Sequence, residues 1–129
     1  MSSLRSPLGK VLGAGSAKDG TEHFWSQRVS AAGIVLLGLW FVAASLGFDA
    51  IDRDGLIEWV AMPMNSILLL LLAVALAWHS NLGVQVVIED YIHGPFLKVV
   101  SLILCKFAHL LAVAAALFAV LKIAFGGAA

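Results

Sequence analysis

Long stretches without a charged residue dominate the pattern of polar and apolar positions along this chain. Val29–Phe48 is a run of 20 residues that contains no Asp, Glu, Lys or Arg. A second uncharged stretch separates Glu58 from Glu89, and a third apolar segment fills most of the C-terminal quarter. Because an α-helix rises 1.5 Å per residue, about 20 apolar residues cross a hydrocarbon core about 30 Å thick. The pattern therefore predicts membrane-spanning helices.

Proline and glycine mark the expected ends of these helices. Pro63 suits the first turn of the second helix. The third helix is expected to start after Gly94 and Pro95 and to end before Gly126. No stretch alternates as a β-strand does. We therefore expect a single all-α membrane domain over residues 1–129, with a cytoplasmic segment at 1–28, two short connections, and transmembrane helices at about 29–48, 62–88 and 96–125.

Composition supports a membrane protein and narrows the possible partners. Hydrophobic residues make up 61% of the chain and charged residues only 12%, whereas soluble domains carry about 25% charged residues. The formal net charge of zero argues against nucleic acid as a partner. Cys105 is the single cysteine, so an internal disulfide is excluded, and no Cys/His cluster suggests zinc.

The charges are distributed unevenly around the first apolar run, and this predicts an orientation. The residues before that run include four basic side chains, and the connection after it is mostly acidic: Arg5, Lys10, Lys18 and Arg28 against Asp49, Asp52, Asp54 and Glu58. The positive-inside rule then places the N-terminus in the cytoplasm and, after three crossings, the C-terminus in the periplasm. The first 28 residues contain no apolar core of a secretory signal.

Four ionisable residues fall within the expected spans, where such groups are costly and default to a functional hypothesis. They are His79, Lys106, His109 and Lys122. Lys122 lies near the outer end of its helix and is expected to extend its ammonium to the interface. Lys106 is expected either to do the same toward the inner face or to meet an anionic ligand group.

His79 is too deep for its short side chain to reach water. It precedes Asp90 by eleven residues, which is about 16 Å along a helix, and eleven steps of about 100° bring the two residues to nearly the same face. Gly83 lies one turn from His79 on that face. The arrangement would let a flat, bulky group lie against the backbone with its metal on the imidazole.

Helix geometry alone leaves two roles open for His79. One is a hydrogen bond to a backbone carbonyl or a serine on a neighbouring helix. The other is axial ligation of a haem iron. In the second case, the other ligand could be His109, which lies at comparable depth, or a residue of another subunit.

The segment His79–His93 resembles the hydrophobic membrane anchor of succinate dehydrogenase (respiratory complex II). The family pattern has a histidine, a glycine four residues later, and an Asp-Tyr pair eleven and twelve residues after the histidine. This chain matches at His79, Gly83, Asp90 and Tyr91. The segment Glu22–Ala31 is similar to the stretch that leads into the family's first helix.

The resemblance implies a haem site. His79 would be an axial ligand of haem b, with the other ligand from the partner anchor protein of the complex, a cytochrome b. Arg28 would face a haem propionate, with lipid headgroups as the alternative partner, and His23 would approach a propionate too. Since the family pattern does not include His109, an interhelical hydrogen bond becomes its expected use.

The resemblance also implies a quinone site at the inner face, beside the iron–sulfur subunit. Reduction of ubiquinone needs two electrons and two protons, so its carbonyl oxygens need hydrogen-bond donors as charge develops on them. Tyr91 offers a neutral phenol donor, and Asp90 would orient its surroundings or help admit protons. His93 is expected in the solvated connection, where it could relay protons.

The implied protein is a membrane anchor of succinate:ubiquinone oxidoreductase in the bacterial inner membrane, or in the mitochondrial inner membrane of a eukaryote. FAD and the iron–sulfur clusters would belong to the flavoprotein and iron–sulfur partner subunits, since no flavin-binding motif is present here. Two alternatives are an anchor of a fumarate reductase that uses menaquinol and a non-redox membrane assembly subunit.

Overall fold

The computed structural model describes residues 17–47 and 52–126, with side chains from Thr21 onward. Regular structure in these ranges is entirely helical, and four helices follow one another along the chain: α2 (Ala17–Ser45), α3 (Arg53–Ala61), α4 (Pro63–Tyr91) and α5 (Pro95–Gly126). Several residues named above lie outside the described part: Arg5, Lys10, Phe48 and Asp49. The side chain of Lys18 is outside it too.

Three of these helices are long and apolar enough to cross a membrane, which confirms the expected all-helical fold with three spans. The candidate spans are Thr21–Ser45, Pro63–Tyr91 and Pro95–Gly126. The helix α2 begins at Ala17, well before the uncharged run that predicted it. An uncharged run marks only the part in hydrocarbon, whereas a helix satisfies its own backbone hydrogen bonds and can continue into the interface.

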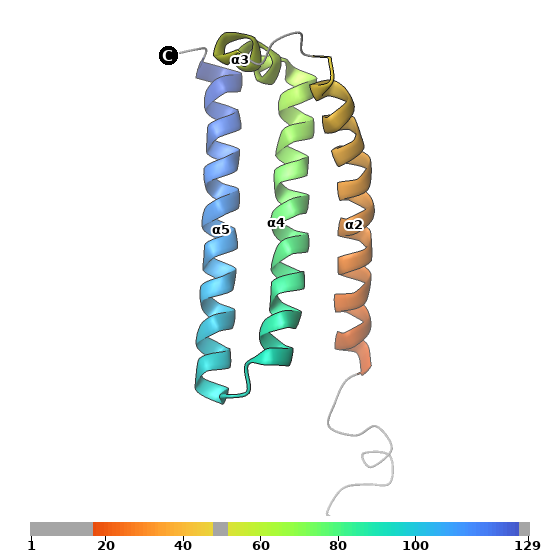
Figure 1. Ribbon diagram of the computed structural model, residues 1–129, viewed down its shortest axis with the longest axis vertical. Coiled ribbons are helices and arrows are strands. Elements are labelled where there is room, and N and C mark those ends of the chain that lie inside the picture. The colour runs from red at the N-terminus through yellow and green to blue at the C-terminus, as the bar shows by residue number, and fades with distance from the viewer. Residues whose placement is uncertain (1–16, 48–51, 127–129) are drawn as a thin grey trace, which may run out of the picture.

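The three long helices form a layer, with α4 between α2 and α5 (Figure 1). The helix α4 packs against both neighbours, whereas α2 and α5 make no contact with each other in the described part of the chain. Only Val60, Leu72 and Ser66 are buried among the described residues. Most large apolar side chains therefore face outward, as they do when lipid or another subunit surrounds spanning helices.

The first connection contains the short helix α3, which the hydropathy pattern does not predict. Asp52 caps its start by accepting a hydrogen bond from the Gly55 amide at 2.8 Å. Side chains from the first turn of α4 bond to the carbonyl groups in the last turn of α3. The Asn65 amide donates to the Trp59 carbonyl at 2.8 Å, and the Ser66 hydroxyl donates to the Val60 carbonyl. These bonds hold α3 across the end of the layer (Figure 1).

A hydrogen bond joins α4 to α5 at membrane depth. The Nδ1 atom of His109 lies 2.8 Å from the Cys105 carbonyl, which can only accept, so Nδ1 donates. In the neutral ring, Nε2 then accepts from the Ser80 hydroxyl at 3.1 Å. This confirms the interhelical hydrogen bond expected for His109.

The bond between Ser80 and His109 predicts a measurable coupling free energy. We expect a double-mutant cycle with Ser80→Ala and His109→Leu to give about 0.6 kcal/mol, and no more than about 1.7 kcal/mol, as for comparable bonds in membrane proteins. Reversible unfolding in detergent micelles, followed by circular dichroism, measures it.

The matched control pairs His109→Leu with Ser45→Ala, which removes a half-buried serine whose hydroxyl donates to the Phe41 carbonyl of its own helix. The effects of these two distant changes are expected to add. Additivity in the Ser80 and His109 cycle as well would contradict the assigned bond.

Candidate functional site

His79 lies in the middle region of α4, half-buried at the contact with α2. Its Nδ1 atom is 3.1 Å from the Oγ atom of Ser30 on α2. The hydrogen bond to a neighbouring serine, one of the two roles left open by the spacing, is therefore present.

The bond to Ser30 uses one ring nitrogen of His79 and leaves the other available. Among the described residues, none makes a hydrogen bond to Nε2. A Cβ atom added at Gly83, one turn further on, would meet no atom within 4 Å. Packing within this chain thus does not require a glycine there, and the face of α4 at Gly83 is open. The residues present fit a flat group with an axial imidazole ligand.

The helix α4 runs without interruption from Pro63 to Tyr91, so His79 and Asp90 belong to one helix. Their eleven-residue separation is therefore about 16 Å along its axis. Asp90 and Tyr91 are exposed at its end, Tyr91 to 78%. Within the described residues, no partner is found for either side chain. A phenol and a carboxylate are thus presented together at the end of the span.

The residues around this pair are held in place by hydrogen bonds. The Gln85 amide donates to the Glu89 carboxylate at 2.8 Å, and the Lys98 ammonium donates to the Glu89 carbonyl at 2.7 Å. The His93 ring donates from Nδ1 to the Tyr91 carbonyl at 3.1 Å. The backbone at the end of α4 is therefore tied to the start of α5.

Two further candidate residues lie on α2. The guanidinium of Arg28 packs over the Phe24 ring, with Cζ 5.1 Å from the ring centroid, and no ion pair to it is found in the described residues. The Nε2 atom of His23 is buried and has no hydrogen-bond partner there. The Arg28 guanidinium is thus left for an acid to bind, whereas the His23 ring would have to turn before Nε2 could meet one.

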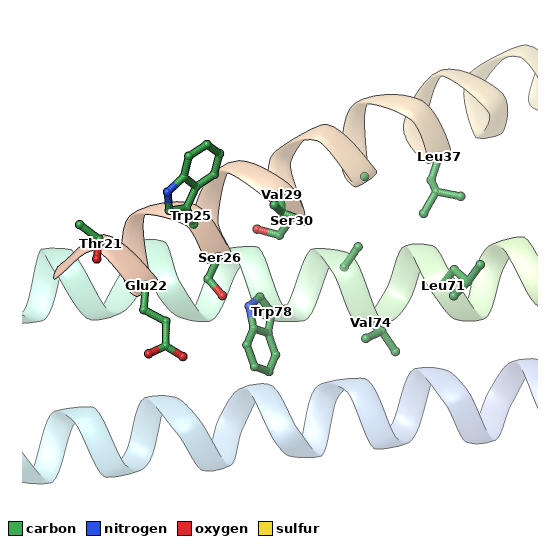
Figure 2. A pocket seen from close by; sticks show the side chains of 12 residues that line it. Thr21, Glu22, Trp25, Ser26, Val29, Ser30, Leu37, Leu71, Val74 and Trp78 are labelled. Atoms are coloured by element: carbon green, nitrogen blue, oxygen red, sulfur yellow. The ribbon is translucent and has the colours of Figure 1, made fainter. Parts of the chain in front are cut away.

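A groove of about 840 Å³ runs between α2 and α4. Figure 2 shows Trp25, Ser26 and Ser30 of α2 and Trp78 of α4 around it. Its lining becomes apolar toward the middle of the layer. His79 is not part of this lining, although Ser30 is. The groove therefore does not include the imidazole itself, although it reaches the residue that bonds to it.

A second groove of about 490 Å³ lies between α4 and α5, and its polar side chains are Asn81, Gln85, Lys106 and His109. Lys106 is exposed there, which is compatible with both roles expected for it. His109 already uses both ring nitrogens in hydrogen bonds, which leaves neither for a metal. No group of three or more His, Cys, Asp or Glu that could hold a metal ion occurs within residues 17–47 and 52–126.

Sequence reasoning did not single out Ser30 and Ser80, the two hydroxyls that partner the histidines. Serine is common on helix faces, and neither residue interrupts the apolar pattern. The feature that could have identified them is their position inside a span, since a small polar residue there is suited to an interhelical hydrogen bond.

Comparison with known proteins identifies the family of the chain. A family model described as succinate dehydrogenase/fumarate reductase transmembrane subunit matches residues 2–121. The succinate dehydrogenase hydrophobic membrane anchor subunit of Rickettsia bellii is 35% identical over 91% of this chain and 94% of its own length. The anchor subunit of Reclinomonas americana is 34% identical, over 75% of this chain and 83% of its own.

The corresponding subunit of Paracoccus denitrificans is 25% identical over 93% of this chain and 92% of its own length. No solved structure matches. Together with the three apolar helices, these similarities make the protein a multi-pass integral membrane protein of the bacterial inner membrane. The chain belongs to the succinate dehydrogenase/fumarate reductase transmembrane subunit family, among the succinate dehydrogenase hydrophobic membrane anchor subunits.

Proposed function

We propose that this chain anchors a succinate:ubiquinone oxidoreductase to the membrane and contributes to a haem b site and a ubiquinone-reduction site. The observation that carries the proposal is the helix α4. It bears an imidazole at mid-depth whose Nε2 has no partner among the described residues, and it ends at an exposed Asp-Tyr pair. The reported relatives are all named for succinate dehydrogenase, which disfavours a menaquinol-using fumarate reductase.

His79 is the proposed axial ligand, through Nε2. A second ligand would come from the partner cytochrome b anchor, since both ring nitrogens of His109 already make hydrogen bonds. When bound, haem b accepts and returns single electrons. The guanidinium of Arg28 would give a propionate a charge-assisted hydrogen bond. A propionate near His23 would also remove the cost of its buried, unpartnered Nε2 once the ring turns toward it.

Tyr91 and Asp90 are the proposed quinone-site residues. By the positive-inside rule, this end of α4 would lie at the cytoplasmic face, where the iron–sulfur subunit would dock and protons would be available from water. The Tyr91 hydroxyl would donate to a quinone carbonyl as negative charge develops on it. Asp90 would guide protons to the same place. The flavin and clusters that oxidise succinate would lie in the partner subunits.

The haem assignment predicts a spectroscopic loss. We expect His79→Leu to abolish the b-type Soret and α bands of the purified complex, because the iron loses an axial ligand. His109→Leu is the matched control, since it removes a half-buried histidine in the neighbouring helix, and it should leave these bands in place. An unaltered spectrum of the His79 variant would disprove the ligand role, and no b-type spectrum in the native complex would favour the non-redox alternative.

The quinone assignment predicts a selective loss of activity. We expect Tyr91→Phe to lower the rate of ubiquinone reduction roughly ten- to a hundredfold, which is what loss of a hydrogen bond to a charged group amounts to. Succinate oxidation by an artificial acceptor should remain at the native rate, because it bypasses the membrane site. Equal ubiquinone reduction by the variant and the native complex would refute the role of Tyr91.

A further inference from the structure

Ser30 makes two polar contacts from one hydroxyl group. Its Oγ atom lies 3.0 Å from the carbonyl oxygen of Gln27, one turn earlier on α2, and 3.1 Å from Nδ1 of His79 on α4. A serine hydroxyl has a single hydrogen to donate but can accept as well. The directions of the two bonds are therefore linked.

The carbonyl of Gln27 can only accept, so the bond between it and Ser30 requires the hydroxyl hydrogen. The Oγ atom then accepts from His79, which must carry its proton on Nδ1. In that tautomer the lone pair is on Nε2, the ring atom without a partner in the described residues. The opposite direction would place the proton on Nε2 and leave no lone pair for a metal.

We propose that Ser30 is the positioning residue of the haem ligand: it holds His79 in the Nδ1–H tautomer, fixes the plane of its ring, and thereby sets the haem reduction potential. This inference rests on the proposed ligand role of His79. It adds a residue of α2 that does not itself touch the iron.

When the ring nitrogen that does not bind the metal donates a hydrogen bond, the imidazole ligand becomes more basic and its ring is oriented. A more basic ligand stabilises ferric iron more than ferrous iron, so the bond lowers the reduction potential, one of the means by which proteins tune haem.

A redox titration of the purified, intact complex tests the proposal. With Ser30→Ala, we expect the ratio of reduced to oxidised haem at a given ambient potential to rise about tenfold, which for a one-electron couple is an upward shift of about 59 mV. The electron paramagnetic resonance g-values of the ferric haem should change too, because the ring loses its fixed orientation.

Ser30→Thr should keep the native potential and g-values, because its hydroxyl can still bond to a backbone carbonyl in the preceding turn. Ser45→Ala is the matched control, since it removes a serine of α2 that also bonds to a carbonyl of its own helix but faces no histidine. Loss of haem from the alanine variant alone, with haem retained in the other two, would support the proposal as well.

Native potential and g-values in Ser30→Ala, or equal shifts in the threonine and alanine variants, would overturn it. These outcomes are distinct from failure of the proposed function, which is tested by His79→Leu. A complex that loses its b-type bands with His79→Leu but is unaffected by Ser30→Ala would keep the haem ligand and lose only the role of Ser30. Retained bands in His79→Leu would overturn both.

Discussion

Hydrocarbon offers no hydrogen-bond partner, so a polar side chain inside the layer needs a partner from its own helix, a neighbouring helix or a ligand. Two consecutive residues of α4 meet this requirement on different sides. His79 bonds to Ser30 of α2, and Ser80 bonds to His109 of α5. Because successive residues of a helix differ by about 100°, the two bonds together fix the rotation of α4 about its axis. That rotation determines where the remaining nitrogen of His79 points.

The same rotation reaches the end of the helix. The helix α4 continues unbroken to Tyr91, so the direction in which Asp90 and Tyr91 emerge is set by bonds formed about three turns earlier. Hydrogen bonds from Lys98 and His93 to backbone carbonyls then hold the final turn against the start of α5. One helix thus gives the two proposed sites a defined distance and relative direction.

The features that follow from local periodicity could be predicted from the sequence. The three spans follow from the absence of charge, and the alignment of His79 with Asp90 follows from regular helix geometry. The partners of the histidines could not be predicted, because the pairing of Ser30 with His79 depends on how two antiparallel helices are aligned along their axes, and hydropathy does not encode this. The helix α3 was not predicted, because its nine residues are too few to show a clear period.

The arrangement of the three long helices in one layer affects how much of this protein a cell retains. In the described part of the chain, α2 and α5 do not touch and almost no side chain is buried. Each helix can therefore insert on its own, but its contacts with the other helices of the chain add little stability. Stable tertiary structure then has to come from neighbouring subunits. We expect folding and assembly to be one event, and surplus copies to be cleared by membrane proteases, so that the abundance of this chain follows the supply of its partners.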